Sequence, residues 1–213
     1  MKTDDLVNFL ATGAAADAQP SARRRMAQAL LLAVPVSLAI VLLGYGVRPD
    51  LSLVMTAPPF WVKLGLPLCL AVAAASTLAR LAVPGVALRG AALAVAAPVL
   101  LLWTLGMLSW FSLPQPERLP ALLGQSWRSC PWSIALIASP IFVATLLALR
   151  QLAPTRPAGA GAAAGALAGG IGATLYALHC VELTLPFLAV WYVLGMLIPV
   201  LAGAWLGPRL LRW

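Results

Sequence analysis

Six long apolar stretches constrain the fold of this 213-residue chain more than any other feature. A transmembrane helix needs about 20 predominantly apolar residues to cross a hydrocarbon core roughly 30 Å thick. The stretches that qualify are residues 26–46, 60–81, 90–112, 132–150, 158–179 and 185–207. Charged residues make up only 9% of the chain, against about 25% in soluble domains. The sequence therefore predicts an all-α integral membrane protein built as a six-transmembrane-helix bundle.

The chain divides into two regions on this interpretation. Residues 1–25 form a cytoplasmic N-terminal segment, and residues 26–213 form the transmembrane domain. A loop near residues 113–131 and several short turns are the other parts outside the lipid. So little extramembrane mass argues against an enzyme, and we expect no cofactor. No span carries Asp or Glu at its centre, which argues against an ion-coupled transporter.

The basic residues indicate the orientation, because Lys and Arg concentrate in cytoplasmic loops. With the N-terminus inside, four of the 14 fall outside: Arg48, Lys63, Arg118 and Arg128. The other ten are cytoplasmic: Lys2, Arg23, Arg24, Arg25, Arg80, Arg89, Arg150, Arg156, Arg209 and Arg212. Both termini are thus predicted to be cytoplasmic, and the positive charge reports topology, with no direct nucleic-acid binding. Lys63 lies one turn inside its span, and we expect it to snorkel outward.

The N-terminal segment begins with the pattern of a short amphipathic helix. Thr3 can cap the helix, and Asp4 and Asp5 suit its positive first turn. An apolar stripe follows at helical spacing: Leu6, Phe9 and Leu10. Helices that lie on a membrane surface usually carry Lys or Arg on the polar face, whereas this one carries acids. We therefore interpret these six residues as a docking helix for a protein partner.

Gly161, Gly165 and Gly169 recur every four residues in the fifth span. Small residues at this spacing let two helix backbones approach closely in a membrane. The pattern predicts helix packing at an interface inside the bundle. A homodimer formed through the same ridge is the alternative.

The three cysteines differ in their predicted surroundings. Cys69 lies in the middle of the second span, where a thiol usually packs as a small hydrophobe. Cys130 and Cys180 lie at the outer ends of the fourth and fifth spans, at one membrane depth. His179 and Glu182 are nearby in sequence, so thiolate, imidazole and carboxylate ligands could meet there. A disulfide, a metal bridge and two unrelated cysteines all fit this pattern.

Several short runs resemble a known family. They are the Met-Lys-Thr-Asp-Asp-Leu start, Ser-Cys-Pro-Trp at 129–132, Tyr-Ala-Leu-His-Cys-Val-Glu at 176–182, Ala-Val-Trp-Tyr at 189–192 and the closing Leu-Gly-Pro-Arg-Leu. Together they are similar to the NrsF family, negative regulators of sigma F, which are six-span inner-membrane anti-sigma factors of proteobacteria. The resemblance covers essentially the whole chain.

The resemblance implies a function and a location. The chain would hold an extracytoplasmic-function sigma factor inactive at the bacterial inner membrane, surrounded by membrane lipid. Periplasmic oxidant or heavy metal would release the sigma factor. The family's cysteine pair maps onto Cys130 and Cys180, which would sense the signal, with His179 and Glu182 beside them.

Two other functions remain as alternatives at this stage. A membrane thiol redox enzyme could pass electrons from the cysteines, although such chemistry usually needs a resolving cysteine close by. The hints of a small transporter are the helix kinks expected at prolines in five of the spans and the charge of Lys63. We expect the regulator, because of the family resemblance and because the chain has so little mass outside the membrane.

Overall fold

The computed structural model describes residues 3–5, 7–8, 22–81, 90–152 and 154–211. Within these ranges six helices are long and apolar enough to cross a membrane. Four of them are α4 (Pro58–Leu81), α5 (Ala91–Ser112), α7 (Cys130–Arg150) and α8 (Pro157–Tyr176). The first span joins α2 (Ala22–Ala39) to the π-helix η1 (Ile40–Tyr45), and the last joins α9 (Leu185–Phe187), η2 (Leu188–Tyr192) and α10 (Val193–Leu210). The prediction of six apolar helices is confirmed.

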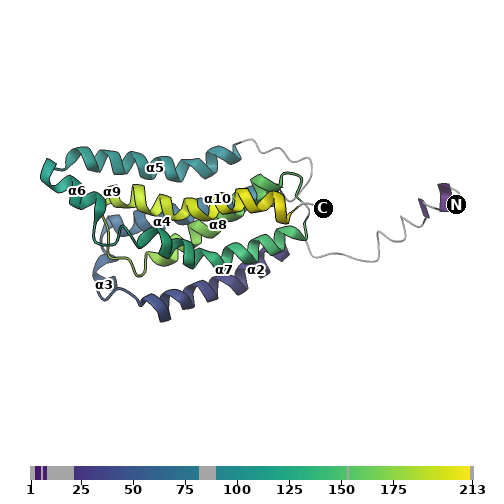
Figure 1. Cartoon of the computed structure of the whole chain (residues 1–213), viewed down its shortest axis with the longest axis horizontal. Helices are drawn as coiled ribbons and strands as arrows, with labels where there is room; N and C mark the ends of the chain where they lie inside the picture. Colours follow the sequence, from purple (N-terminus) through teal and green to yellow (C-terminus); the bar gives the residue numbers. More distant parts are fainter. Residues whose placement is uncertain (1–2, 6, 9–21, 82–89, 153, 212–213) are drawn as a thin grey trace.

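The helices run back and forth between two ends of the bundle (Figure 1). The start of α2 and the end of α10 lie at one end, as an even number of spans requires. The short helices α3 (Leu51–Val54) and α6 (Gln115–Leu123) lie at the other end, beside α9. The fifth span ends at Tyr176, three residues before the predicted boundary, so the chain leaves the helix before it reaches His179.

Helix α8 lies at the centre of the bundle and packs against α10, α4 and α7. Its ridge of Gly161, Gly165 and Gly169 faces α10, where a Cβ on any of the three would overlap the α10 backbone. Gly170 faces α4 and Gly172 faces α7 in the same close manner. Because these positions carry no side chain, three neighbouring helices can approach the α8 backbone directly.

Helix α5 lies at the edge of the bundle, and its contacts are with α4, α9 and η2. The Trp103 Nε1–H group donates a hydrogen bond of 2.9 Å to the Ala189 carbonyl. Most α5 side chains are exposed on the outer surface of the chain, where a membrane would supply lipid contacts.

The predicted N-terminal docking helix falls mostly outside the described residues. Thr3, Asp4 and Asp5 are helical and exposed. Leu6, Phe9 and Leu10, which would form the apolar stripe, lie outside the described part of the chain. The amphipathic helix therefore stays a prediction.

Candidate functional site

Cys130 and Cys180 meet inside the end of the bundle that carries α3, α6 and α9. Cys130 is the first residue of α7, and Cys180 lies in the connection between α8 and α9. The two thiols lie close enough for Cys130 to stabilise a Cys180 thiolate, and they are 0% and 3% exposed. They belong to one apolar cluster with Tyr176, Phe187 and Tyr192. The sequence pattern placed these thiols at one depth, and the structure adds their direct contact.

Local hydrogen bonds fix the backbone of both cysteines. The Cys130 N–H donates to the Ser126 carbonyl at 2.9 Å, and Pro131 follows in the first turn of α7, where proline is well tolerated. The Cys180 N–H donates to the Tyr176 carbonyl at 3.0 Å, which closes the last turn before the chain extends toward α9. We call residues 178–182 the cysteine segment.

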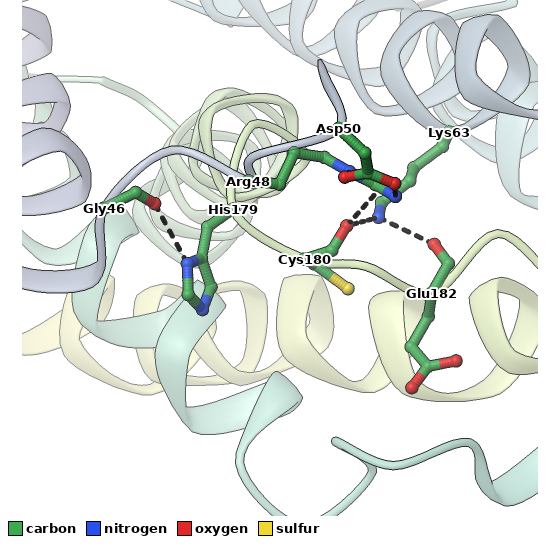
Figure 2. Close-up of polar contacts among 7 residues, drawn as sticks. All are labelled: Gly46, Arg48, Asp50, Lys63, His179, Cys180 and Glu182. Atoms are coloured by element: carbon green, nitrogen blue, oxygen red, sulfur yellow. Dashed lines mark hydrogen bonds and ion pairs between the residues drawn. The ribbon is translucent and has the colours of Figure 1, made fainter. Parts of the chain in front are cut away.

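The Cys180 carbonyl oxygen accepts hydrogen bonds from two cations (Figure 2). Lys63 Nζ donates to it at 2.5 Å and also to the Glu182 carbonyl at 2.7 Å. Arg48 Nη1 donates to the same Cys180 oxygen at 3.0 Å. Lys63 is only 1% exposed, so the expectation that it snorkels to the surface was wrong. Its side chain runs inward because two backbone carbonyls of the cysteine segment lie there and accept its hydrogen bonds.

Arg48 is itself held by an ion pair and a backbone bond. Its Nε and Nη2 donate to the two carboxylate oxygens of Asp50, each at 2.8 Å. Its backbone N–H donates to the Leu178 carbonyl at 3.0 Å. Hydrogen bonding to Asp50 raises the pKa of Arg48 and lowers that of Asp50. The connection after η1 is thereby tied to the cysteine segment with its charge balanced.

His179 points away from the Cys180 thiol in Figure 2. Its Nδ1 lies 3.0 Å from the Gly46 carbonyl, so this nitrogen carries the proton if the pair is a hydrogen bond. Its ring packs against Tyr45 and Tyr176, with centroid separations of 5.2 and 5.8 Å. His179 therefore tethers the cysteine segment to the end of η1.

The Glu182 carboxylate binds the backbone of another connection. It accepts the Gln125 N–H at 2.6 Å, and in Figure 2 it points away from Lys63. Close by, Thr184 Oγ1 donates to the Ala121 carbonyl at 2.7 Å. Glu182 thus binds the connection after α6. Among the residues described, no group of three or more His, Cys, Asp and Glu side chains is placed to hold a metal ion.

The surroundings of Cys180 favour its thiolate form. The hydrogen bond from the Cys130 thiol lowers the pKa of Cys180 most, and burial opposes this effect. The Lys63 ammonium and a backbone hydrogen bond from Glu182 lower the pKa further. Cys180 is therefore the nucleophilic member of the pair, because the thiolate is the reactive form of cysteine.

Tyr192 completes the site from η2. Its hydroxyl is buried without a hydrogen-bond partner among the residues that the structure describes and interacts electrostatically with the Cys180 thiol. Its ring centroid is 5.5 Å from Lys63 Nζ. Sequence reasoning missed Lys63, Arg48 and Tyr192 as site residues. The signal for Lys63 was available, since a charged residue within a span is a candidate functional residue by default.

Cys69 does not belong to this site. It lies on the exposed surface of α4, whereas Lys63 of the same helix is buried. It offers a thiol that can be replaced without touching the pair.

These features define the chain as a multi-pass membrane protein with a buried, electrostatically tuned pair of thiols at one end of its bundle. The chain belongs to the NrsF family, described as "Negative regulator of sigma F", whose pattern matches residues 10–213. The chain is 42% identical to the "Probable anti-sigma-F factor NrsF" of Azospira oryzae over 213 residues, covering all of both chains. It is 40% identical to the "Anti-sigma-F factor NrsF" of Caulobacter vibrioides over 214 residues, again covering all of both. Both names describe regulators, not enzymes. No solved structure matches the chain.

Proposed function

We propose that this protein is an anti-sigma factor that holds a sigma factor of the sigma F type at the membrane and releases it when the thiol pair is oxidised. The observation that carries the proposal is the buried Cys130–Cys180 contact in a chain that aligns end to end with two anti-sigma-F factors. A dithiol already in contact can form a disulfide after a small displacement of either sulfur.

The proposed orientation puts the thiol pair in the periplasm of a bacterium and both termini in the cytoplasm. Seven described basic residues lie at the first turn of α2, the ends of α4, α7 and α10, and the start of α8: Arg23, Arg24, Arg25, Arg80, Arg150, Arg156 and Arg209. The Arg25 side chain hydrogen-bonds Gln151 at this end. The concentration of Lys and Arg there supports a cytoplasmic face in the inner membrane. The thiols then face the oxidising compartment.

The N-terminal segment, residues 1–25, is the proposed docking site for the sigma factor. Its acids, Asp4 and Asp5, are exposed and suit a basic surface on the partner. Leu6, Phe9 and Leu10 would supply the apolar face that enters a groove. Residues 2–21 contain all of these positions, so their deletion should abolish sigma-factor binding while leaving the bundle intact.

Thiol oxidation is the signal we favour. Disulfide formation needs only the two cysteines that are in contact, whereas the described residues supply no third side chain for a metal. A soft metal ion shared by the Cys130 and Cys180 thiolates is the second candidate, because thiolates prefer such ions. In either case the signal would change the positions of α7 and the cysteine segment.

Co-purification of the full-length protein with its sigma factor in detergent tests the proposal. We expect reduced wild-type protein to retain the sigma factor and hydrogen peroxide to weaken binding roughly 5- to 150-fold, the range of typical allosteric coupling. Cys130→Ser and Cys180→Ser proteins should retain it in peroxide. Cys69→Ser is the matched control and should respond like the wild type.

A parallel sample treated with Cd²⁺ separates the two signals. If Cd²⁺ under strictly reducing conditions releases the sigma factor and peroxide does not, the signal is metal binding and not thiol oxidation. Full release from the Cys130→Ser and Cys180→Ser proteins would remove the thiol pair from the mechanism. Absence of binding by the reduced wild type would reject the anti-sigma function itself.

A further inference from the structure

Lys63 is the one buried cation at this site whose charge has no carboxylate partner. Asp50 is bound by Arg48, and the Glu182 carboxylate binds Gln125. In the described part of the chain no carboxylate forms an ion pair with Lys63, whose hydrogen bonds go to two backbone carbonyls. A buried ammonium is costly unless an opposite charge compensates it. The ionisable group that interacts most strongly with it is Cys180, whose carbonyl it binds and whose thiolate form would balance the ammonium.

We propose that Lys63 is a positioning residue of the thiol sensor: its ammonium ties the cysteine segment to α4 while the Cys180 thiolate balances its charge, and oxidation of the pair breaks this tie. The inference rests on the proposed function for its biological role. The contact between Lys63 and the cysteine segment is a property of this chain alone.

The chemical step shows why the tie depends on the redox state. With hydrogen peroxide as the two-electron oxidant, the Cys180 thiolate attacks one peroxide oxygen, and hydroxide leaves. The Cys130 sulfur then attacks the sulfur of the resulting sulfenic acid. The S–O bond breaks, and the oxygen leaves as water with the Cys130 thiol proton. The disulfide is neutral, so the site has lost the negative charge that balanced Lys63.

After this step the remaining partners of Lys63 are weaker. The two carbonyl oxygens and the Tyr192 ring, 5.5 Å from Nζ, offer only partial charges. Lys63 lies early in α4, and its flexible stem can carry the ammonium toward the aqueous end of the helix. Arg48 also interacts with the Cys180 charge, but it keeps its own carboxylate partner, Asp50, when the thiolate is lost. Of the two hydrogen bonds to the Cys180 carbonyl, the one from Lys63 is therefore the one that responds to oxidation.

The position of Lys63 turns this local change into movement of a helix. The cysteine segment connects α8 to α9, and α4 packs directly against α8. While the tie holds, the outer parts of α4 and the α8–α9 connection are linked by the two hydrogen bonds from Nζ. When it breaks, they can separate.

Two measurements on the full-length protein in detergent test the role of Lys63. The first is the equilibrium of the Cys130–Cys180 pair with a glutathione redox buffer, in a Cys69→Ser background. Because Lys63 stabilises the reduced, thiolate state, Lys63→Met should favour the disulfide at least tenfold. For a two-electron couple this is a potential about 30 mV more negative. Lys63→Arg keeps the charge and should stay near the wild-type value, and so should Arg118→Met, the matched control at the same end.

The second measurement is amide hydrogen exchange in residues 178–184. In the wild type, exchange should be slow when the pair is reduced and faster once peroxide has formed the disulfide. In Lys63→Met it should be fast in both states. The wild-type comparison needs no variant, so the test survives if Lys63→Met does not fold.

An unchanged redox equilibrium in a folded Lys63→Met protein would overturn the proposal, and so would wild-type exchange that does not accelerate on oxidation. Neither measurement involves a sigma factor. Failure of the Lys63 tie is therefore distinguishable from failure of the anti-sigma function.

Discussion

Arg48 and Asp50 form a two-pronged ion pair, with both carboxylate oxygens 2.8 Å from guanidinium nitrogens. This pair leaves Arg48 Nη1 aimed at the Cys180 carbonyl. A planar guanidinium held at two positions has little freedom at the third. Asp50 thus orients the hydrogen bond that Arg48 donates to Cys180, which lies 130 positions after Asp50 in the sequence.

Replacement of Asp50 by Asn should loosen the thiol site. The variant keeps the shape but loses the charge, so Arg48 is left less well oriented, and the rate of Cys180 alkylation should rise. Glu117→Gln, which removes an exposed carboxylate at the same end, is the control and should not change the rate. Equal rates in all three proteins would contradict the positioning role of Asp50.

The same ion pair predicts a stability change in acid. Because Arg48 lowers the pKa of Asp50 in the folded state, the stabilisation is present above the unfolded pKa, about 3.9. It is lost as pH falls through the lower folded value. Thermal unfolding in detergent should show wild-type protein losing stability below about pH 4, and Asp50→Asn losing less. A steeper loss in Asp50→Asn would contradict the assignment.

The reactivity of Cys180 should persist below the usual thiol range. Its alkylation by methyl methanethiosulfonate, followed by mass spectrometry of its peptide, should have a pH midpoint below about 8.5. Replacement of Cys130 by Ala removes the main hydrogen bond that lowers the pKa of Cys180. The midpoint should then move upward. A midpoint that is identical in both proteins would show that Cys130 does not stabilise the thiolate.

A side chain at Gly161, Gly165 or Gly169 of α8 should destabilise the packing of α8 against α10. A Cβ at Gly161 would overlap the Gly203 carbonyl in α10, so Gly161→Ala should destabilise the bundle by about 1–3 kcal/mol. Gly159→Ala, two residues earlier, has only a contact at 4.0 Å and should be neutral or slightly stabilising. Thermal unfolding of both variants in detergent measures the difference. Equal losses would mean that α8 and α10 separate more easily than the structure indicates.

The proposed orientation can be checked with single cysteines. In a background of Cys69→Ser, Cys130→Ser and Cys180→Ser, we introduce Glu117→Cys or Thr155→Cys, both at exposed positions. A membrane-impermeant maleimide applied to spheroplasts should label the first and spare the second. The reverse pattern would invert the topology and put the thiol pair on the cytoplasmic side.

The sequence allowed the six spans to be predicted because length and apolar composition alone decide whether a helix can cross a membrane. The thiol contact was only partly predictable. The depth of Cys130 and Cys180 follows from counting spans, but their meeting depends on how the chain turns after Tyr176, where the helix ends early.

The charges at the site could not be placed from the sequence for a related reason. Whether Lys63 snorkels or turns inward depends on which face of α4 meets the bundle and on backbone carbonyls more than 100 residues away. The side-chain directions of His179 and Glu182 likewise depend on the fold. They adjoin Cys180 in sequence, yet an extended connection sends neighbouring side chains in different directions, and both find partners elsewhere.

The glycine packing of α8 has a mechanical consequence. Because the α8 backbone approaches the α10 backbone directly at Gly161, Gly165 and Gly169, we expect the two helices to move together as one rod. The 20 residues of α8 make a rod about 30 Å long. A tilt of roughly 5° at one end of such a rod shifts the other by about 2.6 Å. That is comparable to the helix displacements of known switching proteins. A displacement as long as one sulfur–sulfur bond at one end of α8 would then move the helix end on the opposite side of the membrane.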